Sequence, residues 1–311
     1  MMRLLVAKKT KFTALLLGVV TYCLFLDKPA FLLFPFFIAI YLFIIKKHNR
    51  SFSLIYITFF SLLLLPFGIW NKVNHGKFKV TSIEGGAGVA HMGFWQLKLP
   101  EGYQEHFYWN NNIGYDYTRP ALYPQKRLEA NTSQFEGEWK TILDNVKPYI
   151  SAQDSISLQQ MKSHHPGMFL LYNSKFTLER ESLLWETTLN NIKEYPLYYL
   201  KSRLYHLFRF YVTGINYKKI EASTSFLGKV KGLYPFCITL FFIFTGLLFS
   251  TFILLRKREL LIEYLPFLAL CWYVGVVHLP FAIQARYTVP VHLIIILALS
   301  ISIKEIIFSK K

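Results

Sequence analysis

Cysteine is scarce in this sequence, with 3 cysteines among 311 residues. Cys23, Cys237 and Cys271 each lie inside a long apolar stretch and lack the spacing of zinc ligands or of a disulfide framework. We expect them to be small buried hydrophobic residues. His164 and His165 have no carboxylate at metal-ligand spacing, so neither a metal nor a cofactor is expected.

Acidic residues are also scarce, because 18 Asp and Glu stand against 35 Lys and Arg, a formal net charge of +17. A basic excess can indicate a nucleic-acid partner. No nucleic-acid-binding motif is present, and many of the cations flank apolar segments, so no nucleic acid is expected. An internal repeat is absent as well, which argues against a transporter built from two repeated halves.

Long apolar segments are abundant, and 53% of the residues are hydrophobic. Most of the segments approach the ~20 residues that an α-helix needs to cross a bilayer. The basic N-terminal stretch "MMRLLVAKKTKF" has no small-residue cleavage site after it, so we expect a retained span and not a signal peptide. The apolar segments are Phe12–Leu26, Pro29–Ile45, Phe52–Trp70, Leu233–Leu255, Leu260–Phe281 and Tyr287–Ile303.

The expected fold is a mainly α membrane protein of about six transmembrane helices with a large extracytoplasmic α+β loop domain. Residues 1–70 form an N-terminal hairpin plus a third span, residues 71–232 the loop domain, and residues 233–311 a C-terminal bundle. The first two segments are short, and Asp27 and Lys28 separate them. A re-entrant hairpin or one broken helix across residues 12–45 therefore remains an alternative.

The lysines and arginines outside the loop domain indicate the orientation. With six spans, only Lys28 and Arg286 fall on the side of the loop domain. By the positive-inside rule, both termini are cytoplasmic and the protein lies in the cytoplasmic (inner) membrane. The cations on the opposite side are Arg3, Lys8, Lys9, Lys11, Lys46, Lys47, Arg50, Arg256, Lys257, Arg258, Lys304, Lys310 and Lys311.

The loop domain divides into an irregular first part and a helical second part. Residues 78–82 alternate in polarity and lead into the glycine-rich "EGGAGVAH", which predicts a short strand and a tight turn, and residues 102–124 predict a loop. Helical periodicity begins at Lys175, breaks at Pro196 and resumes.

The helix after Pro196 has an apolar stripe. Together with the cations Lys201 and Arg209, this stripe favours a helix in the outer headgroup region, with the cations reaching anionic groups. Packing of the helix on the loop domain is the alternative. The stripe comprises Leu197, Leu200, Leu204, Leu207 and Tyr211.

Four stretches in order resemble the second half of bacterial GT-C glycosyltransferases, the polytopic enzymes related to protein mannosyltransferases and aminoarabinose transferases. They are "LLLGVVTYCLFLDKPAFLLFPFFIAIYLFI", "LLPFGIWNKVNHGKFKVTSIEGG", "LLWETTLNNIKEYPLYYLKSRLYHLFRFY" and "QARYTVPVHLIIIL". The resemblance implies transfer, on the outer face of the membrane, of a hexosyl or related sugar from a polyprenyl-phosphate donor in cell-envelope glycosylation. Membrane lipids and this donor are the implied partners.

The resemblance covers the family's second half and not its first half. In the family, the stretch that carries the catalytic aspartate belongs to that first half and precedes the part matched here. The chain is then a truncated or split enzyme whose missing half a membrane partner supplies. The alternative is a non-catalytic membrane subunit or lipid-binding helper that retains the fold. Whether this chain transfers a sugar alone is left open.

The resemblance and the chemistry of transfer together select candidate residues. Transfer requires a base for the acceptor hydroxyl and cations for the departing phosphate. Arg286, beside Tyr287, matches the family's Arg-Tyr turn, and Lys28 matches its basic-Pro turn, so these residues are expected to bind the lipid phosphate. Both cations could instead be ordinary interfacial anchors.

Two acidic residues are candidates near these cations. Asp27 has the chemistry of a base but follows a later helix than the family's aspartate, and pairing with Lys28 is its alternative role. Glu84, Gly85, Gly86 and His91 form a glycine-rich segment that is expected to approach the sugar or the acceptor, although a histidine beside glycines is commonly structural.

Overall fold

The computed structural model describes residues 10–44, 50–83, 86–95, 98, 125–150, 174–212, 220, 222–281 and 288–308. These residues form helices and no strand, so the protein is mainly helical in its described part. The helices are α2 (Lys11–Asp27), η1 (Pro29–Leu33), α3 (Phe34–Ile44), α4 (Arg50–His75), α5 (Gly86–Trp95), α7 (Gln125–Val146), η5 (Lys147–Tyr149), α9 (Ser174–Glu194), α10 (Pro196–Tyr211), α12 (Phe226–Ile238), η7 (Thr239–Phe244, a π-helical turn), α13 (Thr245–Arg256), α14 (Arg258–His278) and α15 (Val289–Phe308).

The chain divides into two compact units. The first unit comprises residues 1–83 and 254–273, and the second comprises residues 84–253 and 274–311. Residues 254–273 therefore belong with the first helices, and residues 233–253 and 274–311 belong with residues 84–232.

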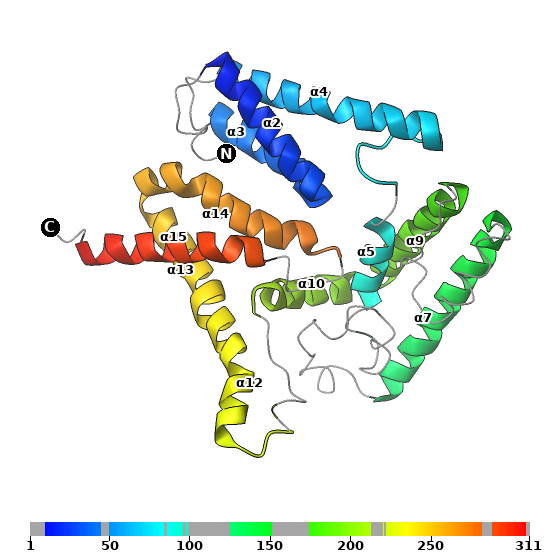
Figure 1. Ribbon diagram of the computed structural model, residues 1–311. Coiled ribbons are helices and arrows are strands. Elements are labelled where there is room, and N and C mark those ends of the chain that lie inside the picture. The colour runs from blue at the N-terminus through cyan, green and yellow to red at the C-terminus, as the bar shows by residue number, and fades with distance from the viewer. Residues whose placement is uncertain are drawn as a thin grey trace. The chain divides into compact units, whose positions relative to one another are not determined.

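In the first unit, α2 and α3 pack on α4 (Figure 1). A Cβ added at Gly18 of α2 would lie 2.9 Å from the Phe59 ring, so glycine permits the close approach of α2 and α4. The α2 helix ends at Asp27 because Lys28, which precedes Pro29, adopts an extended conformation (φ −147°, ψ 108°). Asp27 and Lys28 thus form the predicted break between two short helices.

The predicted strand at residues 78–82 is wrong. Asn71 near the end of α4 is buried, and its side-chain amide donates hydrogen bonds to the carbonyl oxygens of Lys79 (2.5 Å) and Thr81 (3.0 Å). These carbonyls are therefore bonded to a helix side chain and not to a neighbouring strand. The predicted glycine turn is also corrected, because Gly86 begins helix α5.

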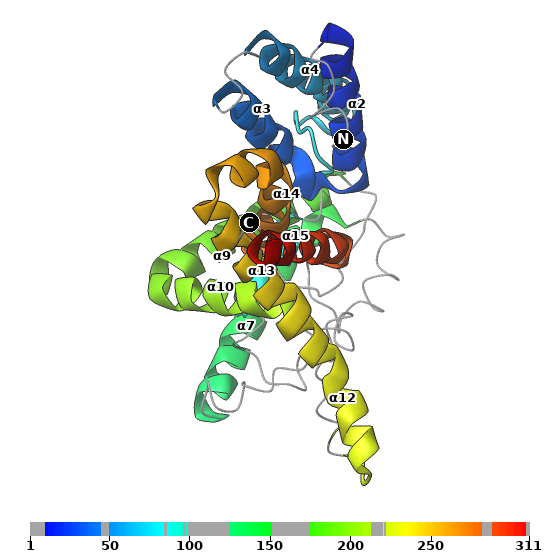
Figure 2. The same ribbon diagram turned by 90° about the vertical axis from the view of Figure 1, so that its left-hand side faces the viewer.

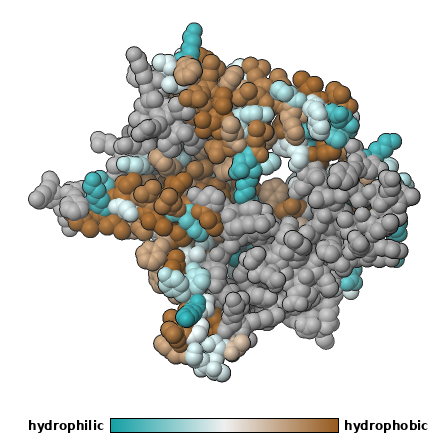
Figure 3. Space-filling model, in the orientation of Figure 1, coloured by the Kyte–Doolittle hydropathy of each residue, from teal (hydrophilic) through white to brown (hydrophobic). Residues whose placement is uncertain are grey.

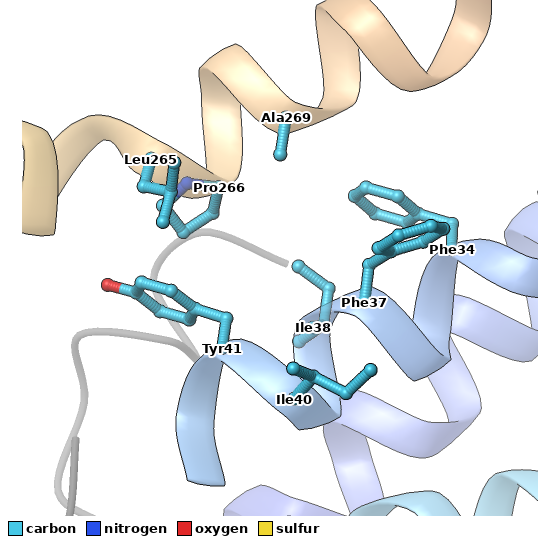
Figure 4. A pocket seen from close by; sticks show the side chains of 8 residues that line it. All are labelled: Phe34, Phe37, Ile38, Ile40, Tyr41, Leu265, Pro266 and Ala269. Atoms are coloured by element: carbon cyan, nitrogen blue, oxygen red, sulfur yellow. The ribbon is translucent and has the colours of Figure 1, made fainter. Parts of the chain in front are cut away.

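An apolar cavity of about 220 Å³ lies between α3 and the first half of α14, both in the first unit (Figure 4). One wall comes from α3 and the other from α14. The lining residues are Phe34, Phe37, Ile38, Ile40, Tyr41, Leu265, Pro266 and Ala269.

In the second unit, α5 packs on α9, and α7 also contacts α9. The segments α12, η7 and α13 follow one another as a continuous helix from Phe226 to Arg256 (Figure 2). At Gly246 of α13 an added Cβ would lie 3.2 Å from Leu299, which indicates close packing of α13 on α15.

Among the described residues, two helices are long and apolar enough to cross a membrane, namely α4 with 26 residues and Phe226–Arg256 with 31 residues. Pro29–Phe43 and Tyr264–His278 are shorter apolar helices, so the structure does not confirm six spans. Apolar side chains such as Leu54, Leu62 and Ile69 of α4 are exposed. Figure 3 shows hydrophobic residues covering much of the surface of α2 to α4 and of α13 and α15.

All three cysteines were expected to be buried, but only one of them is. Cys271 is buried, whereas Cys23 and Cys237 are exposed. All three are free thiols, so they form no disulfide framework.

Candidate functional site

The second unit places helix α5 between α7 and α9 by means of small residues. Ala87 packs with Ile142 and Leu184 in a buried cluster. The Ala87 backbone N–H donates a 3.1 Å hydrogen bond to Oε2 of Glu181 on α9. A carboxylate is favourable there because the first turn of a helix presents unpaired N–H groups and positive partial charge. This contact fixes the start of α5 and the side chains that follow it.

Four side chains converge on the carboxylate of Glu138 in α7. Oε2 lies 2.9 Å from Nε2 of His91 and accepts a 3.0 Å hydrogen bond from Nε1 of Trp95. Asn191 of α9 donates to both oxygens at 3.1 Å, and Gln134 donates to Oε1 at 3.3 Å. We name these five residues the Glu138 cluster. Because Trp and the amides offer N–H donors, the arrangement suits an ionised carboxylate.

Accessibility differs between the two titratable members of this cluster. The His91 side chain is fully buried and stacks on Phe135 with ring centroids 5.8 Å apart, whereas the Glu138 side chain is 15% exposed. Glu138 is therefore the member that can reach an external group. A carboxylate paired with an imidazole can accept a proton and redistribute its charge over both groups.

The ammonium group of Lys98 lies against four aromatic rings, which we name the Lys98 cage. Its Nζ atom is 4.1 Å from the ring centroid of Phe94, 4.9 Å from Trp95 and 4.5 Å from both Tyr195 and Tyr198. Lys98 is buried, so desolvation strengthens the attraction between the cation and the rings. Trp95 belongs to both groups and connects the Lys98 cage to the Glu138 cluster.

Helix α10 begins at Pro196, as predicted, and has two contrasting faces. The outer face exposes Leu197 (81%), Leu200 (58%) and Leu204 (63%). The inner face, comprising Ser202, Arg203, His206, Arg209 and Phe210, is buried. This distribution is the reverse of a helix on a soluble protein, where the apolar face is the buried one.

Two residues of the predicted interfacial helix differ from expectation. Arg209 lies on the buried inner face of α10, unlike the exposed Lys201 with which it was grouped. Tyr211 is also buried, because it packs against Gly275 of α14, where an added Cβ would lie 2.5 Å from the Tyr211 hydroxyl. The exposed part of the stripe is therefore its N-terminal half.

Arg203 connects three helical elements of the second unit. Its guanidinium donates to the carbonyl oxygens of Gly93 in α5 (2.7 Å) and of Leu279 just after α14 (2.6 Å), and lies 4.8 Å from the Tyr199 ring centroid. Carbonyl groups at helix C-termini carry negative partial charge and suit a cation. Burial lowers the pKa of Arg203 to about 10, while the neighbouring Tyr199 and Tyr198 act in the opposite direction.

His206 is completely buried, and within the described residues neither of its ring nitrogens has a hydrogen-bond partner. Burial lowers the pKa of His206 well below its usual value, and the positive charges of Arg203 and Arg209 lower it further. The imidazole is therefore neutral at physiological pH, with one N–H donor and one acceptor nitrogen.

The sequence-predicted candidates fall into different parts of the chain. Asp27 is exposed at the end of α2, and Lys28 follows it in the first unit. Gly86 begins α5, and His91 is a member of the Glu138 cluster. Glu84, Gly85, Arg286 and Tyr287 lie outside the described residues, as do His164, His165 and residues 102–124.

Sequence reasoning missed Glu138, although the sequence contains a signal for it. Phe135, Trp139, Ile142 and Val146 recur at helical spacing and form an apolar stripe on α7, and Glu138 falls within that stripe. A carboxylate on an apolar stripe needs buried donors. Its partners were not identifiable, because His91 and Asn191 are 47 and 53 residues away along the chain.

No protein-family model, curated protein or solved structure matches this chain. Within the part of the chain that the structure describes, no three His, Cys, Asp or Glu side chains group as metal ligands. In its described part the chain is thus a mainly helical protein with two helices long and apolar enough to span a membrane. Its carboxylate–imidazole pair, of which the imidazole is buried and the carboxylate partly exposed, lies beside an aromatic-bound lysine.

Proposed function

We propose that this protein is a membrane glycosyltransferase, or the C-terminal half of a truncated or split one, that uses a polyprenyl-phosphate-linked sugar in cell-envelope glycosylation. The observation that carries the proposal is the Glu138 cluster, a partly accessible carboxylate backed by a buried imidazole in an aromatic setting. Inverting transfer from a lipid phosphate needs one well-positioned base, and this cluster provides one.

In the proposed reaction, Glu138 accepts the proton of the acceptor hydroxyl as the acceptor oxygen bonds to the anomeric carbon. The bond between that carbon and the phosphate oxygen breaks, and the polyprenyl phosphate leaves with the electron pair. His91 is buried and is therefore a positioning residue that stabilises the charge on Glu138. Arg286 and Tyr287 remain the proposed contacts of the departing phosphate. Lys28, in the first unit, is proposed separately as a lipid-phosphate contact.

The proposed membrane arrangement has six spans, cytoplasmic termini and an extracytoplasmic loop domain of residues 71–232. Its support is the one-sided distribution of cations and the exposed leucines of α10. The apolar cavity between α3 and α14 also suits a hydrocarbon chain. At about 220 Å³ it exceeds the ~150 Å³ apolar cavity that holds a benzene molecule in another protein.

One observation favours the alternative of a non-catalytic membrane subunit or lipid-binding helper. Both oxygens of Glu138 already accept hydrogen bonds from neighbouring side chains, as expected of a carboxylate that stabilises the helix packing. A catalytic Glu138 has to exchange one of these bonds for the acceptor hydroxyl.

The substitution Glu138→Gln separates the two functions. Membranes from cells lacking the protein are supplied with the wild type or a variant, and transfer of radiolabelled sugar from polyprenyl phosphate to membrane acceptors is measured. Loss of a general base lowers the rate by about 10²-fold or more. The control is Glu136→Gln, the same change at an exposed position of α7.

The proposal requires transfer to fall in Glu138→Gln membranes while the protein accumulates normally and Glu136→Gln remains active. Equal transfer by the wild type and Glu138→Gln contradicts the role of Glu138 and favours the helper. Equal transfer with and without the protein contradicts both functions.

A further inference from the structure

His206 is an unusual feature of the inner face of α10, because both nitrogens of a fully buried imidazole lack partners within the described residues. An unpaired buried polar group costs about 1–3 kcal/mol. A bound molecule with hydrogen-bonding groups would remove this cost. An apolar side chain of similar size would have avoided it altogether.

Positive charge surrounds this histidine on its own helix. Arg203 and Arg209 lie three residues before and after His206, and this spacing places all three side chains on one face. Both arginines are buried. The hydrogen-bond acceptors of Arg203 are two carbonyl oxygens and the Ser202 hydroxyl, all uncharged.

We propose that the inner face of α10 binds a phosphate group, with His206 as a direct hydrogen-bonding partner and Arg203 and Arg209 supplying the positive charge. Inorganic phosphate offers acceptor oxygens for the imidazole N–H and, at neutral pH, a P–OH group for the other nitrogen. A carboxylate offers acceptors alone. The proposal does not require sugar transfer, and it involves none of the residues assigned above to the donor phosphate.

The phosphate can come from free phosphate or from a lipid headgroup. The leucines of the outer face of α10 favour the headgroup, because an exposed apolar stripe opposite the site would hold α10 at a membrane surface. A phosphomonoester headgroup, such as that of phosphatidic acid, presents the same chemistry to His206 as inorganic phosphate, and the experiment distinguishes the two sources.

The test uses the full-length protein in a neutral detergent. Its thermal unfolding is followed by tryptophan fluorescence during titration with sodium phosphate, against sodium chloride at matched ionic strength. A ligand that binds only the folded state raises the Tm, here by at least about 4 °C at a hundredfold excess over Kd. Parallel samples in nanodiscs contain phosphatidic acid or, for comparison, phosphatidylcholine, which has no net charge and whose phosphodiester has no P–OH group.

His206→Phe removes both nitrogens and retains a ring of similar size, and His206→Leu serves where the phenyl ring does not fit. We expect at least one of these variants to fold with an unchanged or higher Tm in phosphate-free buffer and to lose the response to phosphate. The matched control, Lys201→Ala, removes an exposed cation from the same helix and should retain the response. Arg286→Ala should retain it too.

A wild-type response to inorganic phosphate identifies a free-phosphate site, and a response to phosphatidic acid alone identifies a headgroup site. Either supports the proposal if the His206 variants lack it. The proposal is overturned if neither phosphate source raises the Tm, if the His206 variants respond as the wild type does, or if phosphatidylcholine stabilises as strongly as phosphatidic acid. A response lost equally in Lys201→Ala would indicate surface charge attraction and would also overturn it.

Discussion

At the scale of single residues, Trp95 connects two kinds of charge. Its indole N–H donates to the Glu138 carboxylate, and its ring face lies 4.9 Å from the Lys98 ammonium. A negative charge at the N–H edge makes the ring face more attractive to a cation. The carboxylate and the lysine therefore stabilise each other through the aromatic ring, without a direct ion pair being required.

His206 gives a prediction about pH. Its pKa in the folded protein is well below the value of about 6.5 in the unfolded chain, so at lower pH the unfolded chain binds a proton that the folded protein does not. The free energy of unfolding therefore decreases as the pH falls below about 6.5, by up to ~1.4 kcal/mol per pH unit. Arg203 and Arg209 are the charged neighbours that oppose protonation.

The measurement is the denaturation midpoint of the wild type and His206→Phe between pH 7.5 and 5.5 in phosphate-free buffer. The variant should lose less stability over this interval, while Lys201→Ala should follow the wild type. Parallel curves for all three proteins would contradict the assignment of this acid sensitivity to His206.

At the scale of the elements, the contact between α10 and α14 depends on a glycine. An alanine Cβ at position 275 would lie 2.5 Å from the Tyr211 hydroxyl and 3.0 Å from its ring, inside the closest normal contact. We expect Gly275→Ala to destabilise the fold by about 1–3 kcal/mol, as overpacking typically does.

Chemical denaturation of Gly275→Ala measures this loss, and Gly137→Ala on α7 provides the control. Nothing lies within 4 Å of a Cβ at Gly137, so that change should stabilise the helix by up to ~1 kcal/mol. Tyr211→Phe combined with Gly275→Ala should recover part of the loss, because it removes the nearest atom. No recovery in the double variant would show that the hydroxyl is not the obstacle.

The outer face of α10 gives a prediction about membrane binding. Replacing Leu197, Leu200 and Leu204 with Ser removes the exposed apolar stripe and leaves every charge in place. At about 25 cal/mol per Å² of apolar surface, the binding of a peptide of residues 195–212 to anionic vesicles should weaken by more than tenfold.

Vesicle sedimentation at two salt concentrations measures the binding of the wild-type peptide and of the peptide with the three leucines replaced by Ser. A Lys201→Ser peptide is the control, since it should weaken binding mainly at low salt. Equal binding with and without the leucines would mean that charge attraction alone accounts for the interaction.

At the scale of the whole molecule, orientation in the membrane is the property to test. With the three native cysteines replaced by Ala, a cysteine at Glu136 should react with an impermeant maleimide on intact cells, because the proposed arrangement places α7 outside. A cysteine at Lys257 should react only after permeabilisation. Labelling of Lys257→Cys from outside would contradict the proposed orientation.

The sequence alone determined the features that depend on local composition and backbone preference. The apolar segments Phe52–Trp70 and Leu233–Leu255 were predicted, and each forms the greater part of a long apolar helix. The break between Asp27 and Pro29 and the start of α10 at Pro196 were predicted too, because each follows from neighbouring residues. The glycine-rich segment was mispredicted as a turn, because its helix is stabilised by Glu181, which is 94 residues away from Ala87 in the sequence.

Only the tertiary structure decided which polar groups meet and which helix faces are buried. His91 was a candidate from its position in the sequence, but its partner Glu138 became visible only when α5, α7 and α9 were packed together. The periodicity of α10 indicated two faces, yet the burial of Arg203, His206 and Arg209 depends on carbonyl groups and rings supplied by other elements. A helical period specifies which side chains share a face, and only the surrounding helices determine whether that face is buried.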